Sequence, residues 1–135
     1  MDFLTNLHLY QDWALLALRL AVGAIFLAHG TQKFAMWKMK ASEQMPSGML
    51  SVMMVLSVAE TAGGAALIVG FLAQSAGIGL GVIMLGAIWM KISKWKKKFT
   101  GDGGWELDLV LFASAALLAC VGAGVISLDN VFFGI

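Results

Sequence analysis

The residues in this sequence best suited to chemistry are ionisable side chains within otherwise apolar stretches. Residues 18–34, LRLAVGAIFLAHGTQKF, have the composition of a membrane-spanning helix but contain Arg19, His29 and Lys33. A charge at the centre of a bilayer costs about 3 kcal/mol or more, and such residues normally pair or serve a function. At 100° per residue the three side chains fall within about 80° of one another. They form one polar stripe that we expect to face other helices.

The second apolar stretch contains one ionisable residue, Glu60, about 11 positions from its start at Met49. A rise of 1.5 Å per residue places Glu60 roughly 16 Å deep, level with Ala24 of the first stretch. There it must be neutral, paired or hydrated. Because Cβ atoms tilt toward a helix's N-terminus, His29 leans toward Glu60 and Arg19 leans away. We therefore predict a His29–Glu60 hydrogen bond, with Arg19 reaching lipid headgroups, the carbonyl end of the second helix or an anionic ligand. The alternative is a polar cluster that only holds helices together.

Acidic residues also open the last apolar stretch. Glu106 and Asp108 lie on opposite faces of the expected helix, where acids favour a helix N-terminus. Glu106 could in addition pair with Lys33 or Lys91 at the same depth. Cys120 is the single cysteine, so no intrachain disulfide, zinc site or iron–sulfur site can be built from cysteines of this chain. We expect no metal site, and we expect Cys120 to be a packing residue.

Four apolar stretches must position these residues, at about 13–35, 49–72, 76–92 and 105–126. The 135-residue chain is 60% hydrophobic and 13% charged, more apolar than a soluble domain of this size. Each stretch is close to the ~20 residues that cross a bilayer as a helix. We predict an all-α integral membrane protein, an antiparallel four-helix bundle that forms a single transmembrane domain over residues 1–135. The N-terminal residues lack signal-peptide features, so we expect the first span to be retained.

Two of the connections have distinct compositions. Residues 36–48, MWKMKASEQMPSG, are rich in lysine and methionine, and we expect them to lie in the membrane interface. The sequence LAQS joins the second and third stretches, which predicts a tight helical hairpin. Glycines such as Gly64 and Gly77 are expected to let helices approach closely, and they permit a homo-oligomer.

The charged residues are distributed unevenly along the chain. All eight lysines fall at the ends or in the loops of one expected side, and the other side has Asp2, Asp12 and Asp129 but no lysine. Positive charge is retained in the cytoplasm, so we expect both termini to lie outside it. The basic run KWKKKF fits a topology anchor or a contact with anionic lipid better than a nucleic-acid site.

Three segments resemble the DoxX family of small four-span membrane proteins of bacteria and archaea. They are RLAVGAIFLAHGTQKF, VAETAGGAALIVGFLAQSAGIGLGVIML and GWELDLVLFASAALLA, and they extend over about residues 18–126. Members of this family are linked to quinol oxidases, to thiosulfate:quinone oxidoreductase and to thiol- and quinone-stress systems. The resemblance implies a location in the inner (plasma) membrane, and it marks Arg19, His29, Lys33, Glu60 and Glu106 as the candidate ligand-binding or polar-cluster residues.

Three functions remain open from the sequence. The first is a redox-associated subunit that binds a quinone or a similar ligand, with His29, Arg19 and Glu60 supplying hydrogen bonds and a proton route. The chain has no electron carrier of its own, so partner subunits of a redox complex would be needed. The second is an enzyme acting on thiosulfate and quinone, which the lack of a cysteine pair weakens. The third is a non-catalytic assembly factor, lipid-binding scaffold or transporter.

Overall fold

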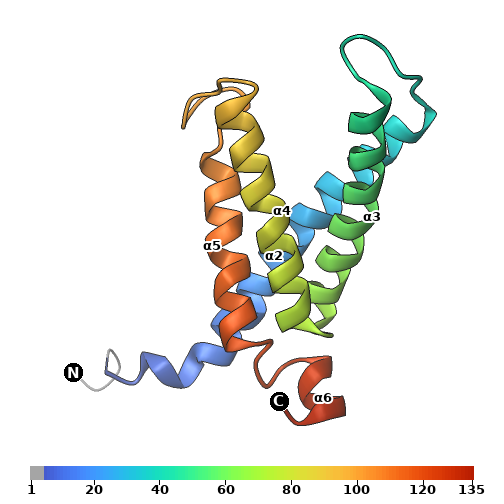
Figure 1. Cartoon of the computed structure of the whole chain (residues 1–135). Coiled ribbons are helices and arrows are strands. Elements are labelled where there is room, and N and C mark those ends of the chain that lie inside the picture. Colours follow the sequence, from blue (N-terminus) through green and yellow to red (C-terminus); the bar gives the residue numbers. More distant parts are fainter. Residues whose placement is uncertain (1–4) are drawn as a thin grey trace.

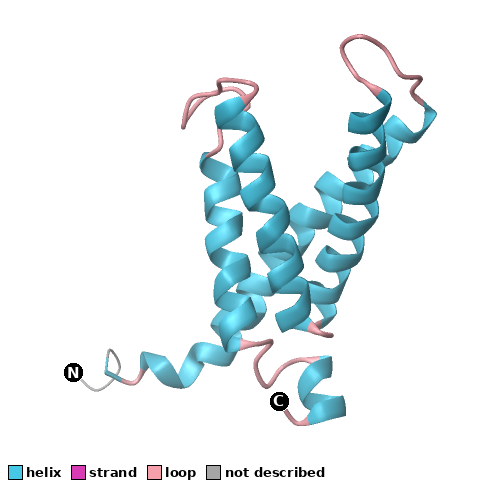
Figure 2. Cartoon of the chain, in the orientation of Figure 1, coloured by secondary structure: helices cyan, strands magenta, loops and turns pink. Residues whose placement is uncertain are grey.

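The computed structural model describes residues 5–135, and its regular structure is entirely helical. A short 3-10 helix, η1 (Leu7–Tyr10), leads into α2 (Gln11–Lys33), which continues as the 3-10 helix η2 (Phe34–Lys38). The helices α3 (Ser47–Val69), α4 (Ala73–Ser93), α5 (Glu106–Val121) and α6 (Leu128–Phe133) follow, and no strand occurs among residues 5–135 (Figure 2). The all-α class is therefore confirmed.

Within residues 5–135, three helical segments are long and apolar enough to cross a membrane: Leu7–Lys38, Ser47–Val69 and Ala73–Ser93. The fourth helix, α5, has 16 residues, which corresponds to about 24 Å at 1.5 Å per residue. The expected span 105–126 is thus too long. The helix stops because Gly122 adopts a positive φ of 86°, which a residue with a side chain rarely takes up.

The long helices associate as two pairs. The most extensive packing joins α2 to α3 and α4 to α5, and the partners within each pair run in opposite directions (Figure 1). The pairs meet near the chain termini and diverge toward the end that carries the 39–46 and 94–105 connections. All eight lysines lie at this divergent end. A closed four-helix bundle inside a membrane stays a prediction.

Glycines determine how closely α2 approaches α3. A Cβ added to Gly23 would lie 2.7 Å from the carbonyl oxygen of Gly64, and one added to Gly30 would lie 2.6 Å from the backbone nitrogen of Thr61. The two backbones are therefore in direct contact at both points, as small residues allow in apolar helix pairs. This register places Glu60 level with Gly30 rather than with Ala24, so the expected depth match is wrong. Because α2 continues as η2 before the chain turns back, the start of α3 lies beyond the end of α2.

The connection between α3 and α4 is a three-residue turn, Gly70, Phe71 and Leu72, and α4 begins at Ala73, earlier than the expected residue 76. Gly70 ends α3 in the left-handed conformation, with a φ of 69°. The amide of Phe71 then donates to the carbonyl of Ala66, which is the usual way for a helix to satisfy its last carbonyls. The tight hairpin is thus present, but the sequence GFL, not LAQS, forms it.

Candidate functional site

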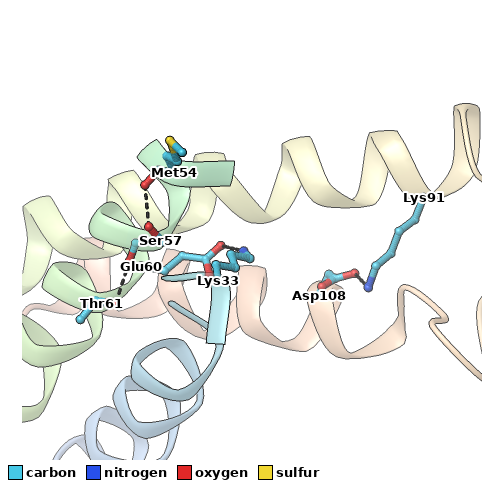
Figure 3. A network of polar contacts seen from close by, with 7 residues as sticks. All are labelled: Lys33, Met54, Ser57, Glu60, Thr61, Lys91 and Asp108. Atoms are coloured by element: carbon cyan, nitrogen blue, oxygen red, sulfur yellow. Dashed lines mark hydrogen bonds and ion pairs between the residues drawn. The ribbon is translucent and has the colours of Figure 1, made fainter. Parts of the chain in front are cut away.

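A buried ion pair lies between α2 and α3. The Lys33 ammonium is 2.5 Å from Oε1 of Glu60 (Figure 3). The Glu60 side chain is 1% exposed and that of Lys33 is 24% exposed. Lys33, not His29, is therefore the partner of Glu60, and the predicted His29–Glu60 hydrogen bond is wrong.

The geometry of α2 explains why Lys33, and not the expected His29, pairs with Glu60. Glu60 is level with Gly30, less than one turn from Lys33 along α2, and side chains on a helix lean toward its N-terminus. The long apolar stem of Lys33 follows this direction and brings the ammonium back to the depth of Glu60. Because the register of α2 against α3 differs from the expected one, the tilt toward the N-terminus directs Lys33, and not His29, to Glu60.

A series of hydrogen bonds lies next to the ion pair and involves two hydroxyl groups of α3 and the indole of Trp37 in η2. The Oγ of Ser57 donates to the carbonyl of Met54 at 2.6 Å and accepts from Nε1 of Trp37 at 2.9 Å. Thr61 donates to the carbonyl of Ser57 at 2.6 Å (Figure 3). Trp37 thereby ties η2 to α3 next to the ion pair. Sequence reasoning missed Ser57 and Trp37, since nothing in their spacing links a loop tryptophan to a serine twenty residues later.

A shallow pocket of about 310 Å³ opens beside the ion pair, lined by His29, Gln32, Lys33 and Met36. His29 is half-buried, and its ring makes no hydrogen bond to any residue that the structure describes. Oε2 of Glu60 is buried and also has no partner within residues 5–135. A buried polar atom without a hydrogen-bond partner is unfavourable. The site therefore has a hydrogen-bond donor or acceptor on His29 and an acceptor on Glu60 that no described residue uses.

A second ion pair joins α4 to α5. The Lys91 ammonium lies 2.6 Å from Oδ2 of Asp108 (Figure 3). It also donates to the carbonyl of Gly104. The expected pairing of Glu106 with Lys33 or Lys91 is wrong, because Glu106 is exposed on the opposite face of α5. The burial of Asp108, and not of Glu106, could have been predicted from the sequence. Asp108 shares the helical phase of the buried residues Leu111, Ala115 and Leu118.

Arg19 lies at the opposite end of the molecule and is 1% exposed. Its guanidinium donates to the carbonyl of Leu67, at 3.4 Å, and to that of Ile126. Of the three expected roles for Arg19, the structure supports the contact with the carbonyl end of the second long helix. The structure therefore separates Arg19 from the pocket at His29.

The C-terminal residues 125–129, which we call the C-terminal clasp, hold this end together. Both carboxylate oxygens of Asp129 accept backbone hydrogen bonds, from Leu72 at 2.6 Å and from Ala73 at 2.9 Å. The amide of Asp129 donates to the carbonyl of Gly70, and that of Val125 donates to Asp12. Asp129 thus caps the first turn of α4 from a position 56 residues later in the chain.

The potential metal ligands and the cysteine are dispersed within residues 5–135. No group of three or more His, Cys, Asp or Glu side chains within residues 5–135 could hold a metal ion. Cys120 is a free, exposed cysteine, so its expected role as a buried packing residue is wrong.

The sequence model of the DoxX family matches residues 14–93, more than half of the chain. The chain belongs to the DoxX family. A protein of Haemophilus influenzae, described only as an uncharacterized protein, is 30% identical over 132 residues, which cover 96% of this chain and 98% of that protein. No solved structure matches this DoxX protein significantly. The matched region includes Lys33, Glu60 and Lys91 but ends before Asp108 and the C-terminal clasp.

Proposed function

We propose that this DoxX protein crosses the inner membrane as an antiparallel bundle of α2, α3, α4 and α5, with the lysine-rich end in the cytoplasm and both termini outside it. The charge distribution supports this orientation, since all eight lysines gather at one end. The 16-residue α5 can span a bilayer with local thinning, as short membrane helices do.

We further propose that the protein is a redox-associated subunit that binds a quinone or a similar ligand in the pocket of His29, Gln32, Lys33 and Met36. The observation that carries the proposal is the pocket itself, in which a free imidazole lies beside a buried ion pair with an unused carboxylate oxygen. A quinone carbonyl needs a donor, which His29 and Gln32 would supply, and Met36 provides an adaptable apolar wall.

The chemistry at this pocket would be binding and proton exchange. An imidazole ring can both donate and accept a hydrogen bond, so His29 would pass a proton to or from a bound ligand, and the charged Lys33–Glu60 pair lies next to it. Electron transfer would need a partner subunit, because the chain contains no cysteine cluster or dinucleotide motif.

Thermal unfolding in detergent with a soluble short-chain quinone tests the proposal. A ligand at a hundredfold excess over its Kd stabilises the protein by about 2.7 kcal/mol, so Tm should rise for the wild type. His29→Ala should abolish the rise without lowering the Tm of the free protein, since His29 makes no hydrogen bond to the described residues. Gln74→Ala, an exposed amide on α4 far from the pocket in sequence, is the matched control and should keep the full rise.

A flat titration of the wild type, or an equal rise in His29→Ala, would contradict the quinone proposal. The first of these results would favour an assembly factor or lipid-binding scaffold instead. Thiosulfate in the same assay addresses the remaining alternative, an enzyme acting on thiosulfate and quinone. Arg19→Ala is unsuitable as a ligand-site variant, because Arg19 links the C-terminal clasp to α3.

A further inference from the structure

The connection between α4 and α5 concentrates positive charge that no acidic side chain neutralises. This basic loop, residues 94–105, contains Lys94, Lys96, Lys97 and Lys98 and one acid, Asp102. The two ion pairs formed within residues 5–135 both lie elsewhere. The four loop ammonium groups are exposed and form no ion pair with any described residue.

Exposed aromatic rings accompany these lysines. Trp89, Trp95 and Phe99 are each about half exposed. The Phe99 ring packs edge-on against Trp105 at 4.7 Å, and the Lys94 ammonium lies 5.8 Å from the centre of the Trp89 ring. Tryptophan and lysine together are typical of the headgroup level of a membrane, where the ring is half apolar and the ammonium meets phosphate.

The backbone holds the basic loop in a defined shape. The amide of Lys97 donates to the carbonyl of Lys91 at 2.8 Å, and the amide of Glu106 donates to the carbonyl of Phe99 at 3.0 Å. Lys96 takes a positive φ of 49°, which is uncommon for a residue with a side chain and reverses the chain here. The loop is therefore tied by backbone hydrogen bonds to the end of α4 and to the start of α5, the two helices that it connects in Figure 1.

We propose that the basic loop is a docking surface for anionic phospholipid headgroups. The aromatic rings set its depth at the headgroup level, and the unpaired lysines select negatively charged lipid over zwitterionic lipid. This inference depends on the membrane placement and not on the quinone site, so either one can fail without the other.

Native mass spectrometry of the detergent-solubilised protein tests the proposal. The protein is mixed with equal amounts of dioctanoyl phosphatidylglycerol and dioctanoyl phosphatidylcholine, which have the same acyl chains and different headgroups. Each lysine near an anionic surface favours binding about fivefold, so we expect phosphatidylglycerol adducts to exceed phosphatidylcholine adducts by about tenfold or more. Replacing all four lysines by glutamine should bring the ratio close to one, and replacing them by arginine should preserve it.

The double variant Lys38→Gln/Lys40→Gln is the control, because these two exposed lysines lie at the same end of the molecule, at the end of η2 and in the 39–46 connection. It should keep most of the headgroup preference. No preference in the wild type, or an equal loss in the control variant, would overturn the assignment to the basic loop. Displacement of the lipid by millimolar inorganic phosphate would overturn lipid docking in favour of a site for free phosphate.

Discussion

The two partners of the Lys33–Glu60 ion pair differ greatly in their exposure to solvent. Lys33 is 24% exposed, so without a partner its ammonium can move toward water along a flexible stem. Glu60 is 1% exposed and has no such route. Removing one partner of a buried pair leaves the other charge uncompensated, and this cost depends on which side chain remains. Removal of Lys33 should therefore destabilise the protein more than removal of the Glu60 charge.

We therefore expect Lys33→Met to lower the free energy of unfolding by about 3–5 kcal/mol, the usual effect of breaking a buried pair. Glu60→Gln should cost much less, because an amide accepts the Lys33 hydrogen bond without carrying charge. The double variant Lys33→Met/Glu60→Gln should recover most of the stability lost in Lys33→Met. Thermal unfolding in detergent measures all three, and additive losses in the double variant would contradict a coupled pair.

At this scale the sequence identified Lys33 and Glu60 as polar-cluster residues but not as partners. The choice between His29 and Lys33 depended on the register of α2 against α3, which two glycine contacts determine. Register between helices is a property of three-dimensional packing, and local spacing does not encode it. The burial of Asp108, by contrast, could be predicted from the sequence, because Asp108 lies on the same face of α5 as the buried apolar residues.

Between elements, the helical glycines differ in their surroundings: Gly30 of α2 and Gly77 of α4 lie against the backbone of a neighbouring helix, whereas Gly79 and Gly86 of α4 do not. A Cβ at Gly30 would lie 2.6 Å from the backbone nitrogen of Thr61, and a Cβ at Gly79 or Gly86 would meet nothing within 4 Å. Of these last three positions, only Gly30 therefore limits how closely two helices approach.

Gly30→Ala should destabilise the protein by about 1–3 kcal/mol, since backbone atoms of α3 must move to admit the methyl group. Gly79→Ala and Gly86→Ala should be neutral or slightly stabilising, because alanine favours the helix and clashes with nothing. Comparing the three melting temperatures in one detergent gives the measurement. Equal losses at all three positions would mean that close contact between α2 and α3 is not the cause.

The turn between α3 and α4 depends on Asp129, which no local sequence pattern connects to this turn. Asp129 accepts hydrogen bonds from the amides of Leu72 and Ala73. We expect Asp129→Ala to lower stability by about 1–2 kcal/mol, the cost of losing a helix cap, and Asp129→Asn to lose less than that. Hydrogen exchange should speed up at Leu72 and Ala73, while the amides near Glu60 stay protected. An unchanged exchange rate at Leu72 would contradict the cap.

At the scale of the whole molecule, the proposed orientation in the membrane rests on the distribution of charge alone. Starting from a variant with Cys120 replaced by serine, a single cysteine is introduced at Gln11 or at Lys96, both exposed positions at opposite ends. In intact cells a membrane-impermeant thiol reagent should label the Gln11→Cys variant and leave the Lys96→Cys variant unlabelled until the membrane is opened. The reverse pattern would invert the proposed topology.

Sequence patterns predicted the four helical segments to within a few residues, except at the end of α5. Helices α2, α3 and α4 begin or end within three residues of the expected spans, because apolar length is a strong local signal. The separation into two diverging pairs was not predicted, nor were the short helix α6 and the contacts of Arg19 with Ile126. These features join segments distant in the chain, which composition does not connect.

The C-terminal clasp also has a consequence for the order of assembly during biosynthesis. The α2–α3 and α4–α5 hairpins are complete once Val121 has been synthesised, but the amides of Leu72 and Ala73 acquire their partner only from Asp129. The guanidinium of Arg19 can already reach the carbonyl of Leu67, and it acquires its second partner only from Ile126. In the proposed topology, the two hairpins would therefore insert into the membrane before the C-terminal clasp joins them at this end. A nascent chain arrested before residue 125 would keep its four long helices but lack the hydrogen bonds that the C-terminal clasp makes to Asp12, Arg19, Leu72 and Ala73.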